Sequence, residues 1–391
     1  MRFARKENSM KIVFQKDELL SNLIPVMSTV SNKNTITSLE GVLIETLEGN
    51  TVRFSTYDMN KGTRTTFEAL EVIEGGSYIV NAQRLMQIVK VMSESEITLE
   101  VDEKLIIHIT SGNSGFTMSA IAGSDFPGLP ELSGERCFAL TCDCLKNMIG
   151  KVMHSIAEFD TRPTLCGAYF IMKAGSMEVI SCDSYSLSRC SVRSEIENVG
   201  RIQEEQSSFI LPGHALNEIM KLLSDKKSKV EIYLTRKHAI LRFDNVVFFT
   251  RLIEGQYFDY ERVTPHNQPI VMEVSRERLI SGLERALLVA EEKIQGSGKS
   301  YVKLSVKGDV LALTSTSTSG RVYDEMPCIH AGADLEIGFN CRYLINNVRA
   351  AASDELVIKF RSANEAMTIE AKEKKEDESF FYLLLPVRMS E

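Results

Sequence analysis

The 391-residue sequence has no tryptophan, six scattered histidines and no long apolar run. No stretch approaches the roughly 18 apolar residues that a membrane-spanning helix needs, which argues against an integral membrane protein. Residues 1–9 lack the apolar core of a secretory signal, and we expect them to form a disordered extension. The eight cysteines are mostly isolated in the chain, so we predict reduced thiols and a cytoplasmic location.

Patterns that carry catalysis or bind metals are also missing. The histidines show no H-x-x-x-H spacing, and no G-x-S-x-G nucleophile elbow is present. Cys137, Cys142 and Cys144 form C-x4-C-x-C, which differs from the paired C-x2-C of structural zinc sites. The Gly-Ser-Gly-Lys-Ser segment at 296–300 has Lys293 where a Walker loop needs glycine. We therefore expect no cofactor and no metal, and the missing patterns argue against these kinds of catalytic site.

Positive charge is not in excess either. The chain holds 45 Lys and Arg against 53 Asp and Glu, a formal net charge of −8. This balance argues against a protein coated in positive charge to grip DNA, although a locally basic surface remains compatible with it.

One pattern is present three times, at intervals of about 130 residues. Leu19, Leu145 and Leu279 each open an apolar stripe at i, i+4, i+7 and i+8, the spacing of a helix with one buried face. A second such helix begins near 80–85, 211–216 and 339–344. A repeat of this length is a whole domain, since solenoid units are much shorter. The sequence predicts three tandem copies of one α+β domain, at 10–130, 131–265 and 266–391.

Short strands are expected around the helices of each copy. In the first copy the alternating apolar residues predict strands at 11–14, 42–44, 52–56, 77–80, 97–101 and 105–109.

The second helix of every copy carries a basic residue at one equivalent position: Lys90, Lys221 and Arg349. Each follows the leucine that opens the stripe by five residues, which places it about 140° round the helix from that leucine. Further basic residues on the predicted helices are Arg84, Lys146, Lys151 and Arg342. Such positions suit contact with the phosphates of a polyanion without regard to sequence. Because aromatic side chains do not alternate with them, double-stranded DNA is favoured over a single strand.

Three tandem copies, outward basic helix positions and three local motifs together resemble the bacterial sliding clamps, the β subunits of DNA polymerase III. The motifs are Asp125-Phe-Pro127, Glu336-Ile-Gly-Phe-Asn340 and Leu385-Pro-Val-Arg-Met389, and the resemblance covers residues 10–389. It implies a DNA-clamp fold in which helices line the inside of a ring and antiparallel sheets lie outside. It also implies a head-to-tail homodimer that encircles duplex DNA, slides along it and tethers partners, as a non-catalytic processivity factor.

The resemblance also implies two protein-binding sites. In the first, Leu288 and Val289 meet Phe116 and Met118 of the other subunit. The sequence supports this independently, because Leu288 and Val289 lie off the buried stripe, where the other copies have polar residues. The second is a groove for short linear peptides of the polymerase, the clamp loader and repair proteins. Its residues, carried over by position, are Leu165, Cys182, Ser184, Tyr185, Leu187, Phe258, Arg262, Val263, Leu383, Leu385, Pro386, Val387, Arg388 and Met389.

Lys33 and Arg162 fall in loops that contact DNA in the family. The groove also departs from the family pattern, since Ser184 stands where many relatives have glycine, and Ser186 and Phe258 replace arginine and proline. These departures leave the peptide preference open.

A second functional class remains as an alternative. A hydrolase or transferase of several domains would place its active site in a cleft between domains. Asp183 lies beside Ser181 and Ser184, but a turn-forming role accounts for it. The missing catalytic pattern and the outward basic positions favour the clamp.

Overall fold

A computed structural model describes residues 9–31, 36–130, 136–193, 196–198, 206–224, 227–290, 301–317 and 320–389. Within these ranges the chain forms two compact units. The first contains residues 9–143 and 217–252, and the second contains residues 144–198, 206–216 and 253–389.

The same order of elements occurs three times, which confirms three tandem copies that combine helices with antiparallel sheet. The first copy runs β1 (Met10–Gln15), α1 (Lys16–Val26), β2 (Gly41–Thr46), β3 (Thr51–Tyr57), β4 (Lys61–Glu68), β6 (Ser77–Asn81), α2 (Ala82–Val91), β7 (Glu96–Val101), β8 (Ile106–Ser111) and β9 (Ser114–Ala122). The second runs β10 (Arg136–Thr141), α3 (Cys142–Val152), β11 (Gly167–Lys173), β12 (Ser176–Cys182), β13 (Ser186–Arg193), β15 (Gln206–Pro212), α4 (Gly213–Leu222), β16 (Lys229–Leu234), β17 (His238–Phe243) and β18 (Val246–Arg251). The third runs β19 (Ile270–Ser275), α5 (Arg276–Ala290), β20 (Val302–Lys307), β21 (Val310–Thr316), β22 (Arg321–Pro327), β24 (Leu335–Phe339), α6 (Cys341–Ala350), β25 (Glu355–Phe360), β26 (Met367–Ala371) and β27 (Glu378–Leu384). Each copy adds one small strand: β5 (Glu71–Glu74), β14 (Glu197–Asn198) or β23 (Ile329–Ala331).

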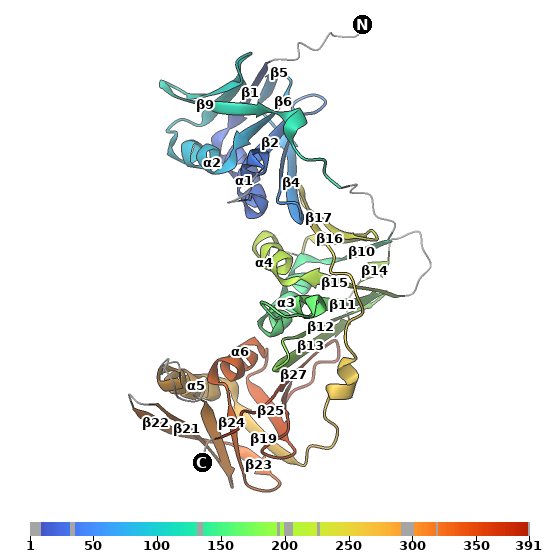
Figure 1. Ribbon diagram of the computed structural model, residues 1–391, viewed down its shortest axis with the longest axis vertical. Coiled ribbons are helices and arrows are strands. Elements are labelled where there is room, and N and C mark those ends of the chain that lie inside the picture. Colours follow the sequence, from blue (N-terminus) through green and yellow to red (C-terminus); the bar gives the residue numbers. More distant parts are fainter. Residues whose placement is uncertain are drawn as a thin grey trace. The chain divides into compact units, whose positions relative to one another are not determined.

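Antiparallel pairing organises both units (Figure 1). In the first unit the strand order is β10-β16-β17-β18-β4-β3-β2-β6-β9-β8-β7-β1-β5. In the second unit one sheet has the order β15-β11-β12-β13-β27-β26-β25-β19-β23, and another has the order β22-β21-β20-β24.

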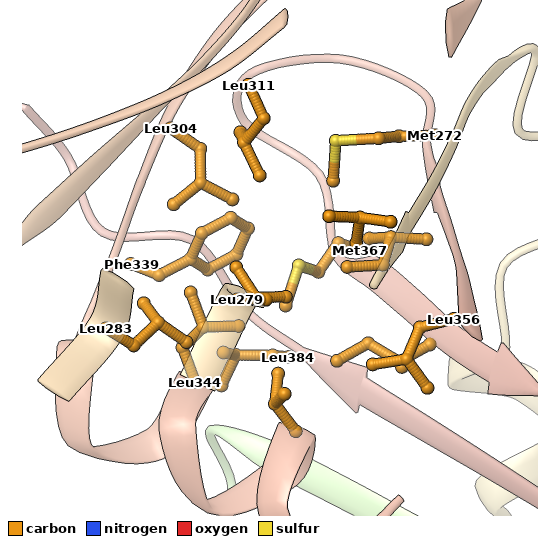
Figure 2. Packing of buried hydrophobic residues seen from close by; sticks show 14 of the residues in the cluster. Met272, Leu279, Leu283, Leu304, Leu311, Phe339, Leu344, Leu356, Met367 and Leu384 are labelled. Carbon is orange, nitrogen blue, oxygen red and sulfur yellow. The ribbon is translucent and has the colours of Figure 1, made fainter. Parts of the chain in front are cut away.

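The predicted apolar stripes bury as the sequence indicates. Leu19, Leu145 and Leu279 are all almost completely buried, as are Leu85, Leu216 and Leu344 in the second helices. In the third copy these leucines meet strand residues such as Leu304, Phe339 and Leu356 in one continuous core (Figure 2). Helices α5 and α6 therefore close one side of this core, and burial of their apolar stripes holds them on the sheets.

Strand pairing also joins neighbouring copies. In the first unit β18 pairs with β4, so a strand of the second copy extends a sheet of the first. In the second unit β27 pairs with β13, so a strand of the third copy extends a sheet of the second. Beside the first of these junctions, Phe126 of the Asp-Phe-Pro motif packs against Ile240 and Phe249 in a shared apolar cluster.

Strands β4 and β9 are absent from the strands predicted for the first copy. Strand β4 reads Lys-Gly-Thr-Arg-Thr-Thr-Phe-Glu, and its buried side chains include the hydroxyls of Thr63 and Thr65. Strand β9 is largely exposed along 114–119. Neither strand shows the regular apolar alternation on which strand prediction depends.

Two adjacent residues of α1 test the packing of the first core. Leu23 is fully buried, whereas Ile24 is 57% exposed. Replacing Leu23 with alanine removes buried methyl groups and leaves a cavity, so we expect a loss of about 2–5 kcal/mol in the free energy of unfolding of this copy. Ile24→Ala is the matched control and should stay within about 0.5 kcal/mol. Urea unfolding followed by circular dichroism would measure both, and equal midpoint shifts would contradict the described packing.

Candidate partner-binding and DNA-facing surfaces

The equivalent basic positions of the second helices are exposed, as the sequence predicts. Lys90, Lys221 and Arg349 lie near the ends of α2, α4 and α6, each on the side away from the buried stripe. Helices α2 and α6 begin at asparagine caps, since the side chains of Asn81 and Asn340 accept hydrogen bonds from backbone amides of the first turn. The capped helices fix the direction in which these cations point.

Two of these three basic residues form ion pairs with acidic neighbours. Lys221 pairs with Glu218 at 3.2 Å, and Arg349 pairs with Glu284 of α5 at 2.7 Å. Lys90 forms no ion pair with any residue in the described part of the chain. The pair of Arg349 with Glu284 is exposed on both sides and therefore weak. Glu218 is only 14% exposed and also pairs with Lys61 at 3.5 Å, so Lys221 is held more firmly.

The remaining basic residues differ in exposure. Arg84 and Arg342 are exposed on α2 and α6, and Lys146 is half-buried on α3. Lys33 lies outside the described residues.

The position of Lys151 differs from the one predicted from the sequence. Its side chain is only 4% exposed and forms an ion pair with Glu378 at the start of β27. Asn147, one turn earlier on α3, also donates to Glu378 at 3.1 Å. The prediction that Lys151 faces DNA is therefore wrong, because the residue holds α3 to a strand of the next copy. The sequence around Lys151 contains no acid, and its partner comes from a segment that is distant in sequence.

Arg162 lies beside a predicted peptide-site residue. Its guanidinium contacts both carboxylate oxygens of Asp160, with Nε to Oδ1 at 2.9 Å and Nη2 to Oδ2 at 3.0 Å. Nη2 also donates to the hydroxyl of Ser184 at 2.5 Å. The DNA contact expected of this loop stays a prediction, and the structure shows in addition that Arg162 lies near the predicted peptide groove.

Most of the predicted groove residues gather around one apolar cluster in the second unit. Leu165, Leu187 and Leu383 are buried together, and Cys182 and Phe258 pack against them partly exposed. Tyr257 stacks on Tyr169 with ring centres 5.1 Å apart, which ties the segment after β18 to this cluster. The cluster therefore provides an apolar floor built from predicted groove residues that are far apart in the sequence.

Exposed apolar side chains extend this floor. Tyr185, Val263 and Leu385 are each about half exposed. Arg262 lies beside Val263 and pairs with Asp259 at 2.8 Å. Large apolar groups kept in water next to a buried apolar cluster are typical of a surface that binds a partner.

The chain end is held at this surface by backbone hydrogen bonds. The Leu385 amide donates to the Tyr185 carbonyl at 2.9 Å, and the Val387 amide donates to the Gly338 carbonyl at 2.8 Å. Met389 lies over Gly338, where an added Cβ would come within 2.9 Å of its Cγ. Glycine at 338 therefore allows the tail residues Pro386 to Met389 to pass close to β24.

Tyr343 is a surface residue that the sequence reasoning missed. It lies in the first turn of α6, and its ring stacks on Tyr185 with centres 5.7 Å apart. The signal available in the sequence was a partly polar aromatic residue just after the Asn340 cap. Its contact with Tyr185 extends the predicted peptide surface toward α6.

The turn that carries Ser184 is conformationally demanding. Ser184 has a backbone φ of 77°, in the left-handed region that glycine occupies without strain. This conformation accounts for the glycine that the sequence comparison with the family expects at 184. Asp183 Oδ1 accepts from the amides of Tyr185 and Ser186 at 2.9 and 2.7 Å, so its role in forming the turn is confirmed.

The predicted dimer residues are at accessible edges. Phe116 on β9 is 42% exposed, and Met118 is half-buried at the margin of the first core. Leu288 on α5 is 80% exposed, with Val289 half-buried beside it.

No group of three or more metal-ligating side chains occurs within the described ranges. Ser181, which the sequence places near Asp183, instead donates its hydroxyl to the Val152 carbonyl at 2.6 Å. In the same part of the chain no helix is long and apolar enough to cross a bilayer.

Comparison with known proteins gives consistent matches along the chain. Residues 10–130, 139–259 and 261–388 match the family models described as the N-terminal, central and C-terminal domains of the DNA polymerase III beta subunit. The beta sliding clamp of Staphylococcus epidermidis is 28% identical over 388 residues, which cover 97% of this chain and 99% of that protein. Among solved structures, the polymerase sliding clamp of Bacillus subtilis is 25% identical, with a TM-score of 0.89 over 98% of this chain and all of that one. The sliding clamp of Bartonella birtlesii is 27% identical, with a TM-score of 0.87 and the same coverage of both chains.

The Asp160–Arg162 pair has a measurable consequence. Hydrogen bonds from the Arg162 side chain and backbone lower the pKa of Asp160 to about 2. The pair should therefore persist above pH 4 and be lost only as the pH falls through about 2. Arg162→Gln should return the Asp160 pKa toward about 3.9, whereas Ser184→Ala should change it less. Carboxyl-carbon NMR titration would measure these values, and an unchanged pKa in Arg162→Gln would contradict the pairing.

Proposed function

Because the chain belongs to the family of DNA polymerase III beta subunits, the bacterial sliding clamps, we propose that it is the processivity factor of a replicative DNA polymerase. Family membership confirms the resemblance inferred from the sequence. It also confirms a non-catalytic role, because sliding clamps hold a polymerase on DNA and perform no chemistry. The hydrolase or transferase alternative is set aside on this ground. Because sliding clamps act in DNA replication, we place the protein in the cytoplasm.

The proposal includes a homodimer, and repeated strand pairing supports it. At the first junction Thr63 of β4 lies opposite Phe248 of β18. At the second junction Ser188 of β13 lies opposite Tyr382 of β27. These pairs occupy equivalent positions, since Phe248 lies opposite Leu241 and Tyr382 lies opposite Ile369 in matching hairpins. The two junctions inside the chain therefore use one register.

Continuing this register predicts how two subunits join. The third copy has Val322 of β22 where the others have Thr63 and Ser188, and the first copy has Phe116 of β9 where the others have Phe248 and Tyr382. Within the described residues β22 pairs with β21 alone, and 114–119 of β9 pair with β8 alone. We propose that β22 pairs with β9 of the partner subunit, with Val322 opposite the partner's Phe116.

A side-chain contact at the second junction supports the same arrangement. The ring of His154 meets Tyr382 edge-on, with centres 5.2 Å apart. His154 follows Leu145 by nine residues, as Leu288 follows Leu279. By this equivalence Leu288 would contact the partner's Phe116, and each exposed apolar residue would bury the other. Two such junctions would close a ring of six copies.

We place duplex DNA inside this ring, against the helices. The proposed DNA-facing residues are Arg84, Lys90, Lys146, Lys221, Arg342 and Arg349, together with Lys33. A closed ring holds DNA by encirclement, so strong contacts are unnecessary and screened attraction over a Debye length of ~10 Å suffices. A net charge of −8 is therefore compatible with a DNA partner, because only the helices that face the DNA need to be basic.

We place partner peptides on the apolar cluster around Leu165, Leu187 and Leu383. Its exposed rim suits aliphatic and aromatic anchors of polymerase, clamp-loader and repair proteins. The domain limits 10–130, 131–265 and 266–391, with 1–9 as an extension, also belong to the proposal, and the three successive family matches support them.

Encirclement predicts a topological dependence of DNA binding. The protein, placed on a nicked circular plasmid by a clamp loader, should stay bound through gel filtration at about 0.15 M salt. Cutting the circle with one restriction enzyme should release it within minutes, because a ring slides off a free end. Radiolabelled protein in the DNA fractions would measure retention. Equal retention on circular and linear DNA would contradict encirclement.

The dimer register predicts a specific cross-link. Directly opposite residues of paired strands place Cβ atoms about 4.5–5.5 Å apart, within the range in which a disulfide can form after small adjustments. A protein with both Phe116→Cys and Val322→Cys should therefore form covalent dimers under mild oxidation, visible on a non-reducing gel. The pair Phe116→Cys with Tyr323→Cys is the control, because neighbouring residues of a strand point to opposite faces.

The same interface can be tested by disruption. Leu288→Asp would bury a carboxylate against an aromatic ring and should give particles of one chain, 43.8 kDa, by light scattering. A dimer of twice that mass in Leu288→Asp, or equal cross-linking in both cysteine pairs, would rule out this interface.

A further inference from the structure

The two arginines beside the apolar cluster each have a carboxylate in their own turn. Arg162 faces Asp160, and Arg262 faces Asp259. Asp160 precedes Arg162 by two residues, and Asp259 precedes Arg262 by three. Each ion pair therefore forms within one short loop segment. Each of these two cations therefore has a carboxylate of its own loop beside it, which lowers its attraction for an acidic group of a partner.

Asp160 is the more strongly engaged of the two acids. Its side chain is 15% exposed, whereas the Asp259 side chain is 55% exposed. The Asp160 carboxylate accepts a hydrogen bond from the Arg162 amide at 2.8 Å and two from the guanidinium of Arg162. It also accepts one from the Ser184 hydroxyl at 3.5 Å. A two-point contact between arginine and carboxylate is geometrically specific and stronger than a single exposed pair.

This pairing leaves a defined part of Arg162 for a partner. Nε and Nη2 are used by Asp160 and Ser184, while Nη1 has no acceptor among the described residues. The Nη1 hydrogens can donate to a carbonyl or amide oxygen. A carboxylate there would gain the same hydrogen bonds, but it would lie close to Asp160 as well, so its charge would gain little.

We propose that Asp160 is a specificity-determining residue that makes this surface prefer peptides with an uncharged hydrogen-bond acceptor facing Arg162 over peptides with an acidic residue there. This inference rests on the proposed peptide-binding function. Asp259 acts in the same sense on Arg262 but more weakly, because that pair is more exposed to solvent.

The test compares peptides that differ in one charge. Two fluorescein-labelled peptides, Ala-Leu-Asn-Leu-Phe and Ala-Leu-Asp-Leu-Phe, keep the same apolar anchors and nearly the same shape. A second pair moves the Asn or Asp to the first position, so that either register of the peptide on Arg162 is sampled. The dissociation constants are measured by fluorescence anisotropy on the full-length protein at pH 7.

We expect the wild-type protein to bind the Asn peptide of at least one pair about fivefold more tightly than its Asp counterpart, the size of effect that one exposed charge pair gives. In Asp160→Asn the ratio should fall to about one or reverse. Asparagine retains the oxygen that accepts the Arg162 amide, so the turn is kept while the charge is removed. In Arg162→Gln the ratio should rise, because Asp160 then has no cation beside it.

Asp377→Asn is the matched control, since it removes the same charge from the exposed hairpin before β27. It should leave the ratio as in the wild type. Equal ratios in wild type and Asp160→Asn for both peptide pairs would overturn the inference while leaving the peptide site intact. Failure of every peptide to bind the wild-type protein would instead overturn the proposed peptide surface itself.

Discussion

The edge strands are the constraint on which the rest of the structure depends. A strand at the edge of a sheet leaves a row of backbone donors and acceptors unpaired, and those groups need a partner or water. Inside this chain the edges of β4 and β13 are covered by β18 and β27 of the following copy. The repeat therefore extends itself strand by strand, and β9 and β22 remain as the two ends of that series.

Side chains at the two inner junctions are adapted to permanent burial. Thr56 and Ser181 each donate to the last turn of the first helix, at the carbonyls of Val26 and Val152. Thr29 bonds to Thr63 at 3.0 Å, and Ser155 to Ser188 at 2.7 Å. The third copy has valines, Val289 and Val322, at the positions of these hydroxyl pairs. Each of these hydrogen bonds joins two residues of one copy, so it holds the end of the first helix to the strands that flank the junction. Valine at both positions packs there without a hydroxyl that needs a hydrogen-bond partner.

The sequence predicted well whatever depends on local periodicity. The six main helices follow from apolar stripes around residues such as Leu19 and Leu279, and the outward direction of Lys90 follows from helix geometry. Features that depend on a contact with a residue far away in the sequence were predicted poorly. Strand β4 was missed because its hydroxyls are buried against other hydroxyls, and Lys151 was misplaced because Glu378 is far away in sequence. The residues near a position in the sequence do not show which distant residue it will contact.

The peptide surface combines both kinds of information. Its apolar floor could be carried over from a family pattern, since it depends on the residue type at matching positions. Its charge could not, because the pairing of Arg162 with Asp160 depends on how one loop turns toward Ser184. Counting arginines near the site overestimates its positive charge, because Arg162 and Arg262 each pair with an acid of their own loop. An arginine contributes attraction to a partner only to the extent that its own neighbours leave its charge uncompensated.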